Sequence, residues 1–146
     1  MRAREYLDAI RAVKHRLAVA DKELEEAKQT MCALKAVDFS KDKVDGGEMA
    51  DLSDKVAQHE KIIAKIETRK QHLIEMREEA RERINALPDF DLQSFLIDYA
   101  INVLPLWQIK SNTHYSHSGF YKRLRKAAYR FEEVYGDWLA NLDIYM

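Results

Sequence analysis

The chain has 146 residues, the length of one domain or of one domain with an appendage. With 34% charged residues, only four glycines and two prolines, the composition is typical of a mostly helical protein and argues against a long sheet. The single cysteine, Cys32, excludes an intramolecular disulfide, and the charged start MRAREYLDAI has no apolar stretch for a signal peptide or membrane span. We therefore expect a cytoplasmic protein that does not enter a membrane.

The first predicted element is a long helix that begins near Tyr6. Apolar or small residues return in alternating steps of four and three, which is the heptad spacing of a helix with one narrow apolar seam. Acidic and basic residues lie between them, as on a solvated face. The seam residues are Tyr6, Ile10, Val13, Leu17, Ala20, Leu24, Ala27, Met31 and Leu34. The alanines among them allow a partner helix to approach closely.

The heptad pattern stops at AVDFSKDKVDGGEMAD, residues 36–51. The pair Gly46–Gly47, a serine and several aspartates compete here with helix formation. We predict that residues 36–51 form the loop of a helical hairpin. The loop is long for a connection between two helices, so it is a place where the chain can carry a contact of its own.

A second helix is predicted to begin at about Leu52. It ends at Pro88, because a residue that precedes proline is disfavoured in the helical conformation. Its seam is interrupted by two basic residues, and His59 is a polar residue of the kind that sets the register of a coiled coil. The seam positions are Leu52, Val56, His59, Ile63, Ile66, Lys70, Leu73, Arg77, Ala80, Ile84 and Leu87.

Two such helices of about 35 residues would make a rod on the order of 50 Å long. A hairpin of two helices buries only a thin seam, so we expect it to pair with a second copy in a homodimer. The alternative is that the hairpin folds back on its own C-terminal segment.

The segment that follows Pro88 predicts shorter helices. In DFDLQSFLIDYAINV, Asp91 is placed to cap a helix, and one face holds Leu92, Phe95, Leu96, Tyr99 and Val103. Pro105 then starts the short helix PLWQIKSNT, in which Leu106 and Ile109 face inward, because proline is tolerated in the first helical turn. His114 and Tyr115 turn the chain, and Ser116 caps the last long helix. That helix buries Phe120, Leu124, Ala127, Ala128 and Phe131.

A short helix, a tight turn and a serine-capped helix with a polar outer face form the helix-turn-helix arrangement. Between Tyr99 and Phe131 the chain has six basic residues and no Asp or Glu. The first residues of the second helix would reach base edges, and the cations further along would neutralise phosphates. The outer face holds His117, Ser118, Tyr121, Lys122, Arg125 and Lys126. Contact with an acidic protein, or a face that is only solvated, are the alternatives.

The segment YSHSGFYKRLRKAAYRFEEVYG, residues 115–136, resembles the recognition-helix end of the ArpU- and RinA-like phage transcription regulators, and more loosely region four of bacterial sigma factors. The front half, from MRAREYLDAI to INALPD, is similar to the coiled-coil part of small phage and prophage proteins of that group in Gram-positive bacteria. The resemblance implies a regulator of late phage genes. It places DNA-facing contacts at His117, Ser118, Tyr121 and Lys122, and phosphate contacts at Arg123, Arg125 and Lys126.

The turn departs from the pattern of these regulators at two positions. Where the two helices touch, a small residue is usual and this chain has Lys110. The turn usually carries glycine, which accepts a positive φ at little cost, and this chain has His114. The segment NVLPLWQ also replaces the usual glycine-containing turn between the earlier helices. These departures favour a second hypothesis, a phage-encoded helical protein that binds and inhibits a host protein, for example a nucleic-acid-handling or defence enzyme, on a degenerate helix-turn-helix scaffold.

The other polar groups predict neither catalysis nor a metal site. His114 and His117 have no nearby cysteine, Cys32 has no histidine and acid arranged with it, and the paired glutamates alternate with basic residues along solvated faces. Trp107 and Trp138 are expected to be packing residues, with contact to a partner as the alternative for Trp107. The apolar tail GDWLANLDIYM is expected to dock on the hairpin or on a second subunit. We expect no catalytic residues, no cofactor and no metal.

Together these patterns predict an all-α protein with a helical hairpin or coiled coil for oligomerisation in residues 1–88 and a helix-turn-helix domain in residues 89–146. The expected function is that of a phage or prophage DNA-binding transcriptional regulator, located in the cytoplasm of the bacterial host. Its expected partners are double-stranded DNA and a second copy of the chain, with host RNA polymerase or another host protein as a further possibility. A coiled-coil protein of purely structural role is a weaker alternative.

Overall fold

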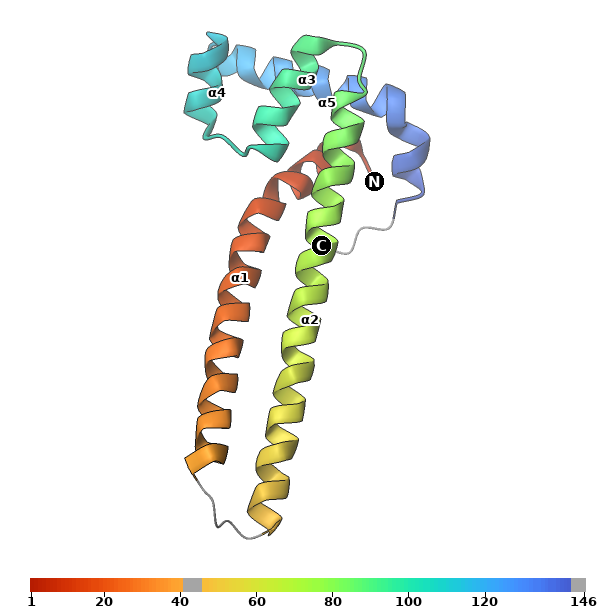
Figure 1. Cartoon of the computed structure of the whole chain (residues 1–146). Helices are drawn as coiled ribbons and strands as arrows, with labels where there is room; N and C mark the ends of the chain where they lie inside the picture. The colour runs from red at the N-terminus through yellow and green to blue at the C-terminus, as the bar shows by residue number, and fades with distance from the viewer. Residues whose placement is uncertain (41–45, 143–146) are drawn as a thin grey trace. The chain divides into compact units, whose positions relative to one another are not determined.

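The computed structural model describes residues 1–40 and 46–142, and the side chains of residues 1–37 and 52–142. Every regular element in this part of the chain is helical, and the predicted all-α fold is confirmed (Figure 1). In chain order the elements are α1 (Ala3–Ser40), α2 (Gly46–Asn85), α3 (Phe90–Leu96), the π-helical turn η1 (Ile97–Ile101), α4 (Leu106–Thr113) and α5 (His117–Ala140). Among the described residues, no helix has the length and apolarity needed to span a bilayer.

The helices form two compact units that share α1 and α2. Residues 16–73 make one unit, which we call the middle unit, and residues 1–15 with 74–146 make the other, the terminal unit. Both ends of the chain therefore contribute to the terminal unit. The division into domains at residue 88 stays a prediction.

The middle unit is a hairpin in which α1 and α2 run side by side (Figure 1). Its predicted seam is confirmed, because Ala20, Ala27, Met31, Ile66 and Leu73 are buried. The other seam residues of this unit are half-buried, as expected for two helices that cover each other on one side only. They are Leu17, Leu24, Leu34, Leu52, Val56, His59, Ile63 and Lys70.

Polar residues beside or within this seam have partners on the opposite helix. His59 Nε2 lies 2.8 Å from the carbonyl oxygen of Ala27, which has no proton to give, so the ring donates. Lys70 Nζ lies 2.5 Å from Asp21 Oδ1. These contacts explain how polar residues can occupy a position that is otherwise apolar.

The predicted loop at residues 36–51 is wrong at both of its ends. Residues 36–40 continue α1, and residues 46–51 begin α2 with Gly46 and Gly47 inside the helix. Residues 41–45 lie outside the described part of the chain. The reason is that extending an existing helix costs only the propensity of each added residue, about 1 kcal/mol even for glycine, whereas nucleating a helix is much less favourable.

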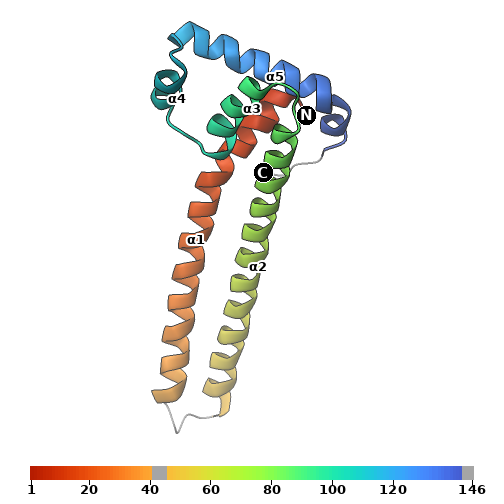
Figure 2. The same cartoon turned by 45° about the horizontal axis from the view of Figure 1, so that its top comes forward.

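In the terminal unit, α5 packs against α3 and the start of α1 (Figure 2). Tyr6 stacks on Phe131 with ring centroids 5.6 Å apart and meets the edge of Trp138 at 5.2 Å. The guanidinium of Arg83 lies 3.6 Å from the Trp138 ring centroid, and Leu139 is buried. The C-terminal part of α5 is thus docked on the first residues of α1 and the end of α2. The predicted homodimer stays a prediction.

The first helix after Pro88 differs from its prediction in two details. Its cap is Asp89 and not Asp91, because Asp89 Oδ1 accepts hydrogen bonds from the backbone N–H groups of Asp91 and Leu92 at 3.0 and 3.4 Å. Val103 was predicted on the buried face of this helix, but it lies beyond the helical turns with a positive φ of 51°. The π-helical turn widens the end of the helix, and the chain must reverse within a few residues to reach Pro105.

Cationic side chains from α1 bind the carbonyl groups that this ending leaves free. Arg11 donates from Nη1 to the carbonyl oxygen of Tyr99 at 2.5 Å and from Nη2 to that of Leu104 at 3.1 Å. Lys14 Nζ donates to the carbonyl oxygen of Asn102 at 3.3 Å. Carbonyl groups at a helix end have no partner within the helix, and here α1 supplies them. Periodicity alone did not reveal this role for α1.

Tyr99 provides a test of the contact between α1 and η1. Its hydroxyl donates to Asp8 Oδ1 at 2.7 Å, and burial, followed by the bond to Asp8, raises the Tyr99 pKa from 10.0 to about 12. The folded chain therefore keeps this proton at a pH where the unfolded chain loses it. The resulting stabilisation is fully present below about pH 10 and is lost as the pH rises toward 12.

We predict that the free energy of unfolding of the Tyr99→Phe variant falls less steeply between about pH 10 and 12 than that of the wild type. At neutral pH the variant is less stable by about 1 kcal/mol, because the bond to Asp8 is lost. Urea unfolding at several pH values measures both effects. Burial also raises the pKa of Tyr6, so part of the alkaline decline remains in both proteins. Equal slopes in the two proteins would contradict the prediction.

Candidate nucleic-acid interface

The helix-turn-helix predicted from the sequence is present as α4, a short turn and α5 (Figure 2). Pro105 stands at the N-cap of α4 with ψ of 145°, and Ile109 is fully buried, as expected. Ser116 caps α5, since its Oγ accepts a hydrogen bond from the N–H of Gly119 at 3.1 Å. A Cβ on residue 119 would lie 3.1 Å from this oxygen, so a glycine there leaves room for the cap.

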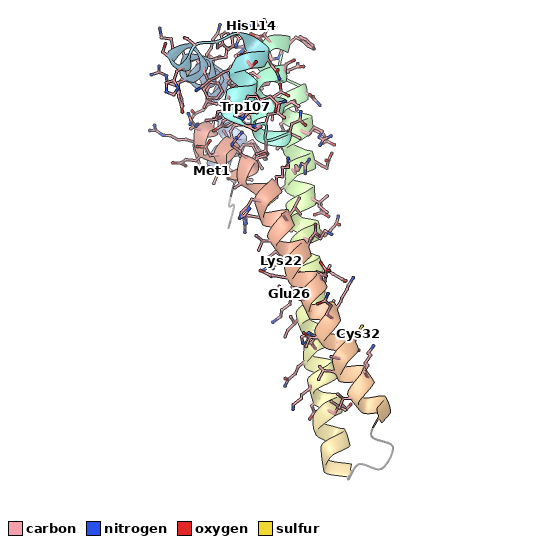
Figure 3. The ribbon with its side chains drawn as sticks, turned by 90° about the vertical axis from the view of Figure 1, so that its left-hand side faces the viewer. Met1, Lys22, Glu26, Cys32, Trp107 and His114 are labelled. Carbon is pink, nitrogen blue, oxygen red and sulfur yellow. The ribbon has the colours of Figure 1, made fainter. Side chains whose placement is uncertain are left out.

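His114 takes the backbone conformation that glycine usually supplies in this turn. It ends α4 in the left-handed region, with φ of 57° and ψ of 26°, and its N–H bonds to the carbonyl oxygen of Lys110. Figure 3 labels His114 and Trp107 at opposite ends of α4. The turn therefore keeps its conformation although it has no glycine. For a residue with a Cβ this conformation is less favourable by about 1–2 kcal/mol, so His114 lowers the stability of the turn.

The proposed reading face of α5 is exposed, and the opposite face is buried. Phe120, Leu124, Ala127, Ala128 and Phe131 are all buried, which confirms the prediction for the inner face. The residues predicted for the outer face are all exposed: His117, Ser118, Tyr121, Lys122, Arg125 and Lys126. His117, Tyr121 and Arg125 follow one another at steps of four and so form one row along the helix.

The cations of this face form no ion pair with the acidic residues of the described chain, although Lys126 lines a groove that also contains Asp89 and Glu133. In the described part of the chain, no ion pair or hydrogen bond joins the side chain of Lys122, Arg125 or Lys126 to another residue. Arg130, one turn beyond Lys126, is paired with Glu133 at 2.9 Å. Within α5, the cations that form no ion pair therefore lie in the first half of the helix.

Arg123 is placed differently from the other predicted phosphate contacts. Its side chain is only 19% exposed, Nη2 lies 3.7 Å from Asp91 Oδ2, and the guanidinium is 5.8 Å from the Tyr115 ring centroid. It lines a groove together with Ser94 of α3 and Asp98 of η1. Arg123 thus joins α5 to α3 and does not share the face of Lys122 and Arg125. Residue type alone could not separate these arginines, but the helical period could have done so, since residue 123 falls on the other side of the helix.

Lys110 contacts the first residue of α5. Its Nζ lies 2.8 Å from Nδ1 of His117, and it lies 5.5 Å and 5.9 Å from the ring centroids of Phe120 and Tyr121. The His117 and Tyr121 rings in turn meet edge to face at 4.9 Å. The sequence identified Lys110 as one of six cations and as a departure from a small residue, and the structure places it against His117.

Exposed aromatic residues near the site were missed or misjudged. Trp107 was expected to be a packing residue, but it is 71% exposed. In α4 only Ile109 is buried, and Trp107 lies on another side of the helix. Phe90 and Tyr129 are 76% and 65% exposed and line one groove with Lys126 and Arg130. The spacing of four between Arg125 and Tyr129 was a signal in the sequence that Tyr129 extends the outer row.

Comparison with known protein families relates the chain to an uncharacterised family. Residues 33–132, about two thirds of the chain, match the model of a family described as "Protein of unknown function (DUF1492)". The chain belongs to the DUF1492 family. The matched region contains α4 and all the predicted site residues of α5. No curated protein and no solved structure gave a significant match.

The Ser116 cap can be tested with a matched control in this DUF1492 chain. The Ser116→Ala variant should lose about 1 kcal/mol in the free energy of unfolding, because the N–H of Gly119 loses its acceptor. The Ser111→Ala variant should stay within about 0.5 kcal/mol of the wild type, since Ser111 is exposed on α4 and caps no helix. Chemical unfolding of the three proteins measures the difference. Equal losses in the two variants would show that Ser116 does not act as the cap.

Proposed function

We propose that this protein is a DNA-binding transcriptional regulator of phage or prophage origin, which binds duplex DNA with the first half of α5. The observation that supports this most is the exposed polar face of α5 with its three cations Lys122, Arg125 and Lys126, which form no ion pair or hydrogen bond within the described part of the chain. The resemblance of residues 115–136 to phage transcription regulators supports the same function, and regulation of late phage genes is the role that it implies.

In this proposal α5 is the recognition helix and lies in the major groove. His117, Ser118 and Tyr121 stand in its first turns, where side chains of a recognition helix reach base edges. Lys122, Arg125 and Lys126 neutralise phosphates, which fixes the position of the helix without reading the sequence. The free N–H groups and the dipole at the start of α5 add a favourable interaction with phosphate.

The proposed regulator is a homodimer that binds two related half-sites. Two features of the middle unit support pairing with a second copy, namely the largely half-buried seam and the exposed apolar side chains Val19 and Ile62, which are 42% and 47% exposed. Two-fold symmetry in the protein requires a pseudo-palindromic site in the DNA. Analytical ultracentrifugation of the free protein tests the dimer independently of any DNA.

The salt dependence of binding is the decisive test of the proposed face. Each phosphate contact contributes about 0.9 to the slope of log K against log salt concentration, because it releases condensed counterions. We predict that the double variant Lys122→Ala, Arg125→Ala binds duplex DNA more weakly at low salt and has a slope smaller by about 2 per protomer. Fluorescence anisotropy at several salt concentrations measures both quantities.

Lys65→Ala is the control, since Lys65 is an exposed lysine on α2 in the middle unit, and its slope should equal that of the wild type. Random duplex and the region upstream of the gene should be compared in the same assay. Preference for the upstream region would identify a regulator that reads sequence. An unchanged slope in the double variant would show that α5 does not face the phosphates, and absence of binding at low salt would overturn the proposal.

The second candidate function is that of a helical protein that binds and inhibits a host protein. The groove lined by Phe90 and Tyr129 favours it, because large aromatic side chains that are 76% and 65% exposed are typical of protein-binding surfaces. A pull-down from host lysate after nuclease treatment distinguishes the two functions. A partner that is retained by the wild type and lost in a Phe90→Ala, Tyr129→Ala variant would favour inhibition of a host protein.

A further inference from the structure

The contact between Lys110 and His117 fixes how the histidine can bind. An ammonium group has only N–H donors, and Nζ of Lys110 lies 2.8 Å from Nδ1 of His117. Nδ1 must therefore accept, since an N–H at this position would place a donor against a donor. In the neutral ring the proton is then on Nε2, on the opposite side of the imidazole from Lys110.

The surroundings hold this arrangement in place. Lys110 is half-buried, and its ammonium lies over the rings of Phe120 and Tyr121, at 5.5 Å and 5.9 Å from their centroids. The His117 ring contacts Tyr121 edge to face, which restricts its rotation. The side chain of His117 is itself exposed, and no hydrogen bond to Nε2 occurs within the described residues. Nε2–H is thus a hydrogen-bond donor with a defined direction and no acceptor among the described residues.

We infer that Lys110 is a positioning residue that makes His117 a hydrogen-bond donor to an acceptor on a base edge in the major groove. The inference rests on the proposed function, because it names what His117 would read. The acceptors available there are N7 and O6 of guanine, N7 of adenine and O4 of thymine, whereas cytosine offers an amino donor. His117 in this state discriminates against cytosine at the position that it contacts.

This role gives a physical reason for a lysine at the position where a small residue is usual. An alanine at residue 110 would leave Nδ1 to solvent, and His117 could then present either ring nitrogen as its donor or its acceptor. A lysine long enough to reach across the turn restricts the ring to one pattern. The departure from the usual pattern at residue 110 is therefore coupled to the histidine at residue 117.

The test uses the full-length protein and duplexes from a preferred binding site in which single bases are replaced by analogues that lack one acceptor, namely 7-deazapurines for N7, 2-aminopurine for O6 of guanine and 5-methyl-2-pyrimidinone for O4 of thymine. We expect one position at which the replacement weakens wild-type binding, on the order of tenfold. The His117→Ala variant should bind both duplexes equally. The Lys110→Met variant, with a side chain of similar length and no donor, should lose most of the discrimination, and Lys110→Arg should retain it because it can still donate to Nδ1.

A spectrum of the free protein tests the contact without DNA. Nitrogen–proton correlation spectra of the imidazole at about pH 8, where an ordinary histidine is neutral, should show the proton of His117 on Nε2 and a proton–proton contact from the Lys110 ε-methylene to the ring. A proton on Nδ1, or discrimination that survives intact in Lys110→Met, would overturn the inference. Failure of the proposed function looks different: the wild type would bind no DNA while the spectrum still shows the Lys110–His117 contact.

Discussion

The burial of one face of α5 is the interaction on which the rest of the terminal unit depends. Phe120, Leu124 and Phe131 have no exposed surface, and the rings around them come from distant parts of the chain. Tyr6 stacks on Phe131, and Phe95 lies 5.5 Å from Phe120. A rotation of α5 about its axis would expose these aromatic rings at a cost of several kcal/mol. The outward direction of the polar face is therefore a consequence of the core.

The same core explains why the terminal unit contains both ends of the chain. The carbonyl groups of Tyr99, Asn102 and Leu104 are bound by Arg11 and Lys14, which lie 88 to 93 residues away in the sequence. A buried carbonyl group without a partner costs about 1–3 kcal/mol, so the ending of η1 depends on the presence of α1. The packing that orients α4 and α5 is thus completed by the first fifteen residues.

Most of the fold could be predicted because it follows from local rules. The seam of α1 and α2, the cap at Ser116 and the inner face of α5 depend only on periodicity and on the chemistry of one side chain. The predictions were wrong where two local rules favour different residues, or where contacts with distant parts of the chain determine the position of a side chain. Asp89 and Asp91 are both suitable N-cap residues, and which of them caps depends on the residue at which the helix begins after Pro88. Of the candidate site, the exposed row was predictable, whereas the pairing of Arg123 required knowledge of α3.

The two departures from the usual helix-turn-helix pattern have different physical meanings. His114 adopts the left-handed conformation that glycine would take, so it preserves the geometry of the turn and lowers only its stability. Lys110 does not disturb the packing of α4, because Ile109 supplies the buried contact and the lysine extends toward His117 and Tyr121. Neither residue therefore argues against a functional recognition helix. A cation at position 110 that contacts the first residue of α5 adds to the positive potential of the face on which Lys122 and Arg125 lie, and this makes Lys110 a part of the site.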